Sequence, residues 1–402
     1  MTERVVVVGA GHAAGQFVAR LRAEKYEGEI VVFGEEPVVP YQRPPLSKAY
    51  LSGEVDLDRV LLRKEDFYTE QNVDIRTSTK VTAIDTAGAT VTAQGETLEY
   101  SHLVLATGAR VRKISLPGSD LNGVHYVRNL ADVDALRPAL TDGAKLAVVG
   151  GGYIGLEVAA VAAKAGVKVT VLEAQDRILK RVATEAIAQH LTQVHESHGV
   201  DVRTGVQVEA FVGDGKVSGV RLGGGETLEV DAILVGIGVV PCTELAESAG
   251  LAVDDGIVVD NRGATADPKV WAIGDCTKHP SRIYDRAVRL ESVHNAMTQA
   301  KVVAANISGK EATYDEVPWF WSDQYDLKLQ IAGLADGHDN TVVRGNPEDG
   351  SFTVFALKGN TVLAADSINS MRDHMECRKL AGAAKAVDPA RLADTEIALK
   401  EV

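Results

Sequence analysis

Cysteine is scarce in this sequence. Its 402 residues include three cysteines, Cys242, Cys276 and Cys377, and no two of them have a C-x-x-C or C-x4-C spacing. This pattern excludes a disulfide framework and favours a reducing compartment. Because free cysteine is commonly buried, we interpret all three as small apolar residues. No redox cysteine pair can lie before Cys242.

Long apolar runs and an excess of positive charge are also missing. No apolar run approaches the length of a membrane span, so we expect no association with a membrane. The chain enters an expected strand almost at once, so we expect no signal peptide and a cytoplasmic location. With 42 basic and 56 acidic residues the net charge is −14, which repels nucleic acid. We also expect no metal site.

What the sequence does contain is one repeated unit. Residues 5–36 and residues 146–174 each hold an apolar β-branched run, a Gly-x-Gly turn, a helical segment, a second apolar run and an acid. Continuous apolar runs are typical of parallel strands buried on both faces. Two such units indicate two dinucleotide sites, so the predicted fold class is α/β with two Rossmann-like domains.

The first unit has the features of a dinucleotide turn. Glycine allows a tight turn and a close approach of the backbone to a pyrophosphate, which the helix N-terminus then faces. Glu35 follows the second strand, where a carboxylate can accept hydrogen bonds from a ribose hydroxyl, and Glu36 is the alternative. The small residues of the turn are Gly9, Gly11, Ala14 and Gly15.

The second unit has the complete Gly-x-Gly-x-x-Gly pattern. Its glycines are Gly150, Gly152 and Gly155, and Glu173 ends the second strand. A carboxylate at that position favours NADH, because it repels the extra phosphate of NADPH. Three cations follow shortly after, and we interpret them as the solvated start of a helix: Arg177, Lys180 and Arg181.

The remaining segments complete three predicted domains. Apolar strands ending in glycine follow each unit, a long helix is expected over residues 286–307, and short strands with a final helix near 370–383 follow Pro318. Two dinucleotide sites in one chain suggest hydride transfer from a nicotinamide to a flavin. We therefore expect an FAD domain at 1–109 and 241–317, a NAD domain at 110–240, and a C-terminal α+β domain at 318–402.

Several motifs run in the order of one known family. They are "GAGHAAG", "PYQRPPLSK", "ATGAR", "GGGYIGLE", "GIGVVP", "AIGD", "LESVHNA" and "PWFWSDQYDLKLQIAG". Over nearly its whole length the chain resembles the FAD-containing, NADH-dependent ferredoxin reductases of oxygenase systems, which are flavoproteins with two dinucleotide domains, like glutathione reductase. "RPPLSK" and "WFWSDQ" are much more specific than the glycine motifs. The resemblance implies that residues 40–50 pack against the flavin.

The resemblance also implies which residues bind the cofactors. Arg43 would lie near the FAD phosphates, Asp275 would bind the ribityl hydroxyls, and His12 would either contact the pyrophosphate or face solvent. The implied FAD set is Gly9, Gly11, Ala14, Gly15, Glu35, Arg43, Lys48, Thr107, Gly108, Asp275, Glu291, Val293 and Trp321. The implied NAD set is Gly150, Gly152, Ile154, Gly155, Glu173 and Gly238.

Three residues are expected to be catalytic by the same resemblance. Lys48 would approach the flavin N5 and O4 region, where a cation stabilises the reduced flavin. Glu157 would point toward the nicotinamide carboxamide and pair with Lys48, and Trp321 would lie against the flavin. On the residues alone, Lys48 is equally well explained as a surface lysine, and an isolated tryptophan is more often a core residue.

The expected function is NADH-dependent reduction of a [2Fe–2S] ferredoxin that feeds a P450 or Rieske oxygenase, with the flavin converting two-electron into one-electron transfer. A rubredoxin reductase, or another NADH-dependent flavin reductase such as monodehydroascorbate reductase, is the alternative. A redox-sensing protein resembling apoptosis-inducing factor belongs to a different class, and the acidic balance argues against its DNA-binding face. Disulfide-reducing and peroxide-reducing enzymes would need cysteine near residues 40–50. Both a monomer and a homodimer remain open.

Overall fold

The computed structural model describes residues 3–402, which form two compact units. Unit 1 contains residues 3–43, 56–110 and 240–318, and unit 2 contains residues 44–55, 111–239 and 319–402. The chain passes from one unit to the other within β8 (Ala109–Val111) and β17 (Val239–Pro241). It also passes between the units on either side of residues 44–55 and after residue 318. Residues 44–55, which follow the first dinucleotide unit in the sequence, thus belong to unit 2 together with the second dinucleotide unit and the C-terminal segment.

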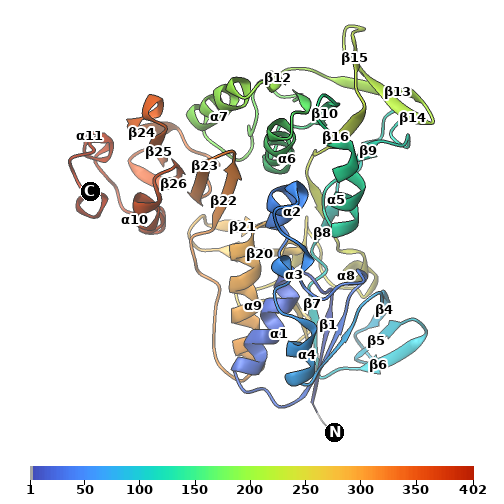
Figure 1. Cartoon of the computed structure of the whole chain (residues 1–402). Coiled ribbons are helices and arrows are strands. Elements are labelled where there is room, and N and C mark those ends of the chain that lie inside the picture. The colour runs from blue at the N-terminus through green and yellow to red at the C-terminus, as the bar shows by residue number, and fades with distance from the viewer. Residues whose placement is uncertain (1–2) are drawn as a thin grey trace. The chain divides into compact units, whose positions relative to one another are not determined.

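Unit 1 is built on a five-stranded parallel sheet. Its order is β19 (Val270–Ala272), β7 (His102–Leu105), β1 (Arg4–Val8), β2 (Glu29–Phe33) and β3 (Val73–Arg76). All strand pairs in it are parallel. Helices α1 (His12–Ala23) and α9 (Val293–Ile307) lie side by side (Figure 1) and bury Phe17 and Val303 against the alternate valines of β1.

The rest of unit 1 surrounds this sheet. Its other strands are β4 (Val81–Asp85), β5 (Thr90–Ala93), β6 (Glu96–Glu99), β18 (Ile257–Val258), β20 (Thr277–Ser281) and β21 (Arg286–Val288), and its other helices are α3 (Leu57–Val60), α4 (Glu65–Glu70) and α8 (Glu244–Ser248). The long helix expected from residue 286 begins at Val293. The expectation was wrong at this end because β21 pairs with β20, and Ser292 Oγ then caps α9 by accepting from Asn295 N–H.

Unit 2 contains a second parallel sheet. Its order is β12 (Asp201–Arg203), β11 (Lys168–Leu172), β10 (Lys145–Val149), β16 (Ala232–Val235) and β9 (Val124–His125). Around it lie α5 (Leu130–Leu136), α6 (Tyr153–Lys164), α7 (Glu185–Ser197) and an antiparallel sheet of β13 (Val208–Asp214), β14 (Lys216–Leu222) and β15 (Thr227–Glu229). The alanine-rich α6 is buried over most of its length, because small side chains allow close packing.

A short segment of unit 2 packs on α6. It consists of the 3-10 helix η1 (Pro44–Ser47) and α2 (Ala49–Ser52). Its anchors are Tyr50, whose hydroxyl donates to Asp134 at 3.2 Å, and Arg137, which donates to the Tyr50 carbonyl at 2.6 Å. The prolines fix the backbone of η1. This packing brings residues near position 48 against α6, more than one hundred residues further along the chain.

The C-terminal part of unit 2 is an antiparallel sheet with two helices. The sheet order is β22 (Trp319–Gln324), β23 (Leu327–Gly333), β26 (Thr361–Ile368), β25 (Ser351–Lys358) and β24 (Asn340–Asn346). The helical segments are η3 (Pro347–Asp349), α10 (Met371–Gly382), α11 (Pro389–Ala393) and η4 (Leu399–Glu401). Two parallel sheets and this antiparallel sheet confirm the predicted fold class.

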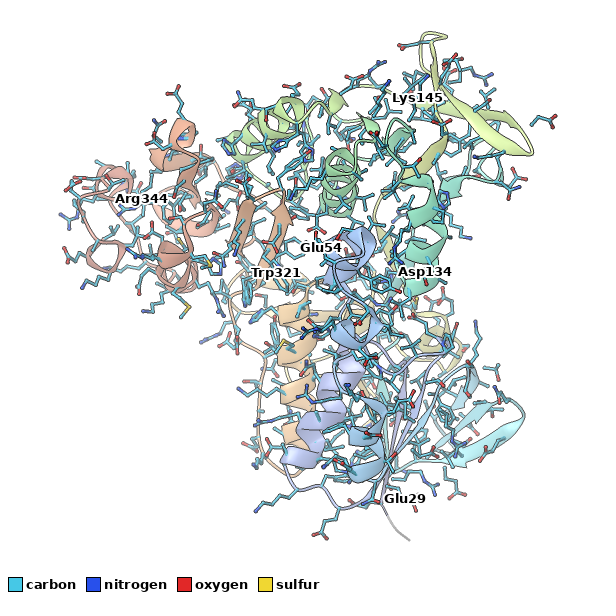
Figure 2. The ribbon with its side chains drawn as sticks, in the orientation of Figure 1. Glu29, Glu54, Asp134, Lys145, Trp321 and Arg344 are labelled. Atoms are coloured by element: carbon cyan, nitrogen blue, oxygen red, sulfur yellow. The ribbon has the colours of Figure 1, made fainter. Side chains whose placement is uncertain are left out.

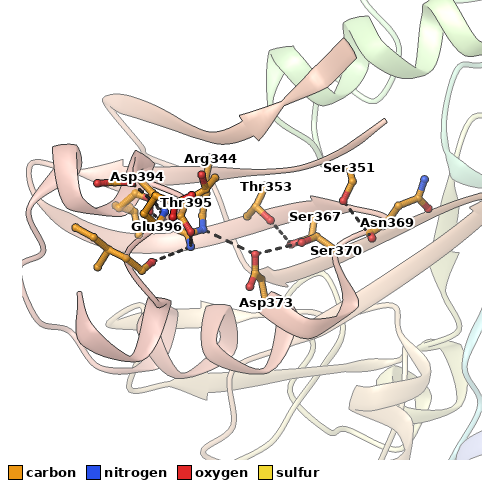
Figure 3. A network of polar contacts seen from close by, with 12 residues as sticks. Arg344, Ser351, Thr353, Ser367, Asn369, Ser370, Asp373, Asp394, Thr395 and Glu396 are labelled. Carbon is orange, nitrogen blue, oxygen red and sulfur yellow. Dashed lines mark hydrogen bonds and ion pairs between the residues drawn. The ribbon is translucent and has the colours of Figure 1, made fainter. Parts of the chain in front are cut away.

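The last residues of the chain are tied to this sheet by one buried arginine. Arg344, on β24, donates to the backbone carbonyls of Leu392, Asp394 and Ile397, and its guanidinium lies 3.8 Å from Asp373 (Figure 3). A charge-assisted hydrogen bond is stronger than a neutral one. Arg344 therefore orders the C-terminal segment. Within residues 3–402, no helix has the length and apolar character needed to cross a membrane.

Candidate functional site: two dinucleotide edges and a buried ion pair

The predicted FAD residues of unit 1 gather at one edge of its parallel sheet. Gly9 follows β1, Glu35 follows β2, Thr107 follows β7 and Asp275 follows β19. The strands are added in one direction from β1 to β2 and β3, and in the other direction from β1 to β7 and β19. Ligands of such sheets bind at the carboxyl ends of the strands at this reversal point. The four residues are therefore placed where a dinucleotide binds.

The glycine turn of unit 1 leaves space where a ligand would need it. Gly9 has a φ of +105°, and a Cβ there would lie 2.2 Å from the Ala106 carbonyl oxygen. A Cβ on Gly11 would meet no atom within 4 Å, and within residues 3–402 no side chain caps α1. The N–H groups of the first helical turn are thus open to an anion. This arrangement fits a pyrophosphate.

His12 is half-buried in this turn, with its ring turned away from solvent. Both of its ring nitrogens are buried, and neither has a hydrogen-bond partner within the described residues. Burial lowers the pKa of His12 to about 4, although Asp275 raises it. A neutral imidazole without a partner is costly in a finished core. The unpartnered ring nitrogens favour contact with a ligand over the alternative that His12 faces solvent.

The acids at the end of β2 have different surroundings. Glu36 accepts from the Tyr41 hydroxyl at 2.5 Å and pairs with Arg43 at 2.7 Å, and Arg43 also lies over the Tyr41 ring. Glu35 is exposed, and its nearest cation, Lys80, is 3.5 Å away. Glu36 is thus committed to orienting Arg43, which leaves Glu35 as the accessible carboxylate of this edge.

A buried glutamine missed by the sequence analysis holds the Asp275 turn. Gln299, on α9, accepts from Gly274 N–H at 2.6 Å and also bonds the Thr277 hydroxyl. No sequence signal distinguishes Gln299 from the other polar residues of α9. Two predicted residues lie at the start of the same helix, where Val293 is its first residue and the exposed Glu291 pairs with Arg289.

The second sheet repeats the arrangement in unit 2. Gly150 follows β10, Glu173 follows β11 and Gly238 follows β16. Gly150 has a φ of +107°, and a Cβ there would lie 2.5 Å from the Gly236 carbonyl oxygen, whereas the nearest atom to a Cβ on Gly152 would be 3.8 Å away. The residues of the predicted NAD set thus also meet at one edge, with space at the second glycine.

Glu173 closes this turn with two hydrogen bonds. Its Oε2 accepts from Gly151 N–H at 2.7 Å, and its Oε1 accepts from Gln175 N–H at 2.8 Å. Two of the neighbouring cations have partners: Lys180 pairs with Asp176 at 2.6 Å, and Arg177 donates to backbone carbonyls of its own loop. α7 begins later than these cations, at Glu185, so they lie in a loop rather than at the start of a helix.

The strongest polar cluster of unit 2 surrounds Glu157. This carboxylate is 2% exposed. Its Oε2 lies 2.6 Å from Lys48 Nζ and 2.5 Å from Ser47 Oγ, and its Oε1 accepts from Ser322 Oγ at 2.7 Å. Burial raises the pKa of Glu157, and Lys48 and the two hydroxyls oppose that rise. The expected pairing of Lys48 with Glu157 is present, and Lys48 is not a surface lysine.

Three consecutive aromatic residues begin β22, namely Trp319, Phe320 and Trp321. Trp321 is half-buried beside Trp319, with ring centroids 5.4 Å apart, and Figure 2 shows it on its strand. Phe320 contacts Tyr153 of α6 at 4.6 Å. The contacts of Ser322, in this motif, and of Ser47 with Glu157 were not predicted. Hydroxyls in "PLSK" and "WFWSDQ" were the available signal.

The thiols take no part in these clusters. Cys276 and Cys377 are buried, as expected, and burial raises the pKa of both. Cys242 is only half-buried, so the expectation of burial was wrong there, and Arg110 Nη1 lies 3.8 Å from its sulfur. Among residues 3–402, no group of three metal-ligating side chains could hold a metal ion.

Comparison with known proteins assigns the chain to a family. The model of the pyridine nucleotide-disulphide oxidoreductases matches residues 3–300, and that of the reductase C-terminal domain matches residues 319–402. The rhodocoxin reductase of Rhodococcus erythropolis is 42% identical over 98% of this chain and 93% of its own. A rubredoxin-NAD(+) reductase of Pseudomonas putida is 40% identical over 91% of this chain and 95% of its own.

A solved structure gives the same result. The covalent putidaredoxin reductase–putidaredoxin complex contains a chain that superposes with a TM-score of 0.96 at 41% identity, covering 99% of this chain and 97% of that one. The chain therefore belongs to the pyridine nucleotide-disulphide oxidoreductases and, within them, to the ferredoxin reductases of oxygenase systems. Membership implies that it binds FAD and a nicotinamide dinucleotide, and both glycine turns fit such ligands.

Proposed function

We propose that this protein takes electrons from NADH and delivers them singly to a [2Fe–2S] ferredoxin that serves a P450 or Rieske oxygenase. The observation that carries the proposal is the ion pair between Lys48 and the buried Glu157, because Lys48 lies in the stretch where a disulfide reductase would need cysteines. Bound FAD supplies the conversion between two-electron and one-electron transfer. The remaining tasks of binding, orientation and charge stabilisation fall to the side chains of this chain.

FAD is proposed to bind at the sheet edge of unit 1. The turn of Gly9 and Gly11 would accept the pyrophosphate, with Ala14 and Gly15 allowing the close approach of α1. Glu35 would bind the adenine-side ribose, and Arg43, oriented by Glu36, would face the phosphates. Support comes from the open Cβ position at Gly11 and the unpartnered His12 ring. The other proposed FAD contacts are Thr107, Gly108, Asp275, Glu291 and Val293.

NADH rather than NADPH is proposed as the electron donor. Glu173 would accept from the ribose hydroxyls, while its charge repels a 2′-phosphate. The hydrogen bonds from Gly151 and Gln175 fix this carboxylate in place. Because Arg177 and Lys180 are already engaged by their own loop, they would provide little compensation for a phosphate. Gly150, Gly152, Ile154, Gly155 and Gly238 complete the proposed site.

Lys48, Glu157 and Trp321 are proposed as the catalytic residues. Lys48 would place a cation at the flavin, Glu157 would accept from the nicotinamide carboxamide, and Trp321 would cover the reacting rings. The burial of Glu157 supports this assignment, because electrostatic interactions are stronger where water is excluded. No general acid or base is required by the proposed reaction.

The ferredoxin is proposed to dock on α10. This helix exposes two methionines, Met371 and Met375, at 61% and 60%, together with Arg372 and Lys379. An acidic ferredoxin and a chain of net charge −14 repel each other at long range, so docking requires a local basic patch. Arg378 lies over the Trp319 ring, which connects this helix with the tryptophan motif.

We also propose a cytoplasmic location.

Acceptor rates test the proposal. FAD-loaded protein is given NADH and, in turn, a [2Fe–2S] ferredoxin, a rubredoxin and a quinone, and kcat/KM is compared. We expect the ferredoxin to be the best acceptor. A better rate with rubredoxin would replace the proposal by the second candidate, which the similarity to a rubredoxin-NAD(+) reductase favours. Slow turnover with every acceptor would instead favour a redox-sensing interaction protein.

A further inference from the structure

Glu157 lies at one end of a line of hydrogen bonds in unit 2. Ser322 Oγ lies 2.7 Å from Glu157 Oε1, and Gln324 Nε2 lies 3.1 Å from Ser322 Oγ. Gln324 Oε1 then lies 2.8 Å from His195 Nε2, and His195 Nδ1 lies 3.0 Å from the Tyr325 hydroxyl. The line therefore connects α6, β22 and α7.

The inner members of this line are cut off from water. Glu157 and Gln324 are 2% exposed, and Ser322 and His195 are 0% exposed. Only Tyr325, at the outer end, is half-exposed. A buried polar group that loses its partner costs roughly 1–3 kcal/mol, so each member depends on its neighbour. The line is thus expected to act as a unit rather than as independent contacts.

An ionised Glu157 fixes the direction of every bond in the line, because a carboxylate can only accept. The Ser322 hydroxyl must donate to Glu157 and therefore accepts from the Gln324 amide nitrogen. The amide oxygen of Gln324 then faces His195, which must donate from Nε2. Its Nδ1 is left to accept from the Tyr325 hydroxyl. Burial lowers the pKa of His195, which agrees with this neutral tautomer.

Protonation of Glu157 would allow the opposite direction. Glu157 would donate to Ser322, Ser322 to the Gln324 oxygen, and the Gln324 amide nitrogen to His195 Nε2. The proton of His195 would then be on Nδ1. The line has two self-consistent orientations, and the charge on Glu157 selects between them.

Other titratable groups act at both ends. At the inner end, Lys48 contacts the second oxygen of Glu157, and Tyr153 faces it from the first turn of α6. At the outer end, His198 stacks on the Tyr325 ring at 3.8 Å, and Lys164 lies 6.0 Å from it. Of the donors to Glu157, only Ser322 is oriented by this line.

We propose that Gln324 and His195 are positioning residues that hold the Ser322 hydroxyl on Glu157 and thereby keep Glu157 a carboxylate beside Lys48. Neither residue is assigned a contact with a cofactor. The proposal rests on the proposed function of Glu157, and it adds α7 and the C-terminal sheet to the parts of the chain that set the charge of the site.

The first test is the tautomer of His195 in the FAD-loaded protein. Histidine is labelled with 15N, and the His195 signals are assigned by their loss in His195→Gln. We expect a neutral ring with the proton on Nε2 near pH 7. A proton on Nδ1, or a charged ring, would overturn the proposal. The measurement needs no turnover, so it remains informative even if Glu157 has no catalytic role.

The second test breaks the line and restores it. The protonation of Glu157 is followed by infrared absorption of its carboxyl group, assigned by loss of the band in Glu157→Gln. We expect His195→Leu to shift the midpoint to higher pH, to shift the acid limb of NADH-driven flavin reduction in the same direction, and to slow reduction on that limb by about tenfold. His195→Gln, which keeps a donor to Gln324, should restore both.

The matched control is His190→Leu, the same change on the same helix but outside the line. It should behave like the native protein. An unchanged infrared midpoint in folded His195→Leu would overturn the positioning role. If His195→Leu does not fold, Gln324→Leu interrupts the same line of hydrogen bonds. If neither variant folds, the tautomer of His195 in the native protein decides whether the proposal holds. An unchanged reduction rate in Glu157→Gln would instead contradict the proposed function alone.

Discussion

The two glycine turns have nearly the same backbone but different side chains. Gly9 and Gly150 follow the central strands of their sheets with φ values of +105° and +107°, and a Cβ on either would strike a carbonyl oxygen, of Ala106 or of Gly236. Beside the first turn lies the unpartnered, neutral His12, whereas the second turn is held by the carboxylate of Glu173. The backbone thus provides a similar edge in both units, and we propose that the side chains determine which dinucleotide fits.

The largest expected effect separates the two turns completely. Gly9→Ala places a Cβ 2.2 Å from a carbonyl oxygen in a left-handed conformation, so we expect the purified protein to lose nearly all its FAD. Gly150→Ala should retain FAD but lose NADH binding. Flavin absorbance and NADH titration measure the two outcomes.

Gly143→Ala is the matched control for both substitutions, since Gly143 has a φ of +78° but no atom within 4 Å of a Cβ. It should keep both ligands. Loss of FAD from Gly150→Ala with NADH binding intact would reverse the assignment of the two turns.

The next prediction concerns Lys48, the cation that unit 2 places beside the buried Glu157. Lys48→Ala should slow flavin reduction by NADH about 100-fold, because a charge facing the developing anion is removed. Stopped-flow absorbance measures the rate. We also expect Lys48→Ala to lower the free energy of unfolding, because Glu157 would remain buried without its cation. Glu157→Gln should avoid that loss of stability, because it leaves no unpaired carboxylate in the buried position.

Lys168→Ala, at an exposed position of β11, controls for the loss of a lysine from unit 2. A normal reduction rate in Lys48→Ala, combined with a lower melting temperature, would mean that the ion pair serves the fold alone.

Glu173 tests whether the second turn selects its ligand by charge. Glu173→Ala should reduce the preference for NADH over NADPH by about tenfold, because it removes an acceptor for ribose and a source of repulsion for phosphate. The ratio of the two kcat/KM values is the measurement, and Glu185→Ala is the control. Equal use of both cofactors by the native protein would contradict the assignment of Glu173.

One titratable group in each unit should make the free energy of unfolding depend on pH, and the two dependences should have opposite signs. Burial raises the pKa of Asp366 in unit 2 to about 6, above its ordinary 3.8, so its contribution to stability is complete below pH 3.8 and is lost as pH rises through 6. Burial lowers the pKa of His12 in unit 1 to about 4, so its contribution is lost as pH falls from 6.5.

Asp366→Asn isolates the first of these effects. Above pH 7 the variant should be more stable than the native protein by about 3 kcal/mol, with little difference near pH 4. Denaturant unfolding of the FAD-free protein at several pH values measures this. A difference that does not change with pH would show that Asp366 is not ionised at a cost in the folded protein.

The smallest expected effect concerns docking. Charge reversal of Arg372 and Lys379 on α10 should raise KM for ferredoxin a few-fold and weaken its salt dependence, while ferricyanide reduction stays unchanged. Reversal of the exposed Lys385 is the control. A ferredoxin rate that is insensitive both to salt and to these reversals would mean that docking is mainly apolar, through Met371 and Met375.

The sequence predicted the elements whose structure is local. A Gly-x-Gly turn after a valine run places Gly9 and Gly150 at the ends of strands, because only glycine tolerates their backbone conformation. The acids that follow the second strands could be predicted for the same reason. The start of α9 could not, because the extended conformation of residues 286–288 depends on hydrogen bonds to β20, across a short turn.

The polar partners of the site depended on contacts between distant segments. Ser47, Ser322 and Gln324 are ordinary polar residues in the sequence, and they acquire a function only because η1 and β22 both pack on α6. His195 lies on an amphipathic helix, where a histidine is usually a partly exposed residue. Its complete burial against β22 could not be read from that helix.

The sequence by itself determined the two parallel sheets, their ligand-binding edges and the absence of thiol chemistry before Cys242, because strand periodicity, glycine conformation and residue identity are local properties. The tertiary structure alone decided that residues 44–55 join the second unit, that Lys48 becomes the ion-pair partner of a buried carboxylate, and that Glu157 is connected through Ser322 and Gln324 to His195. Burial and hydrogen-bond direction set the charge of such groups, and both arise only when distant segments pack together.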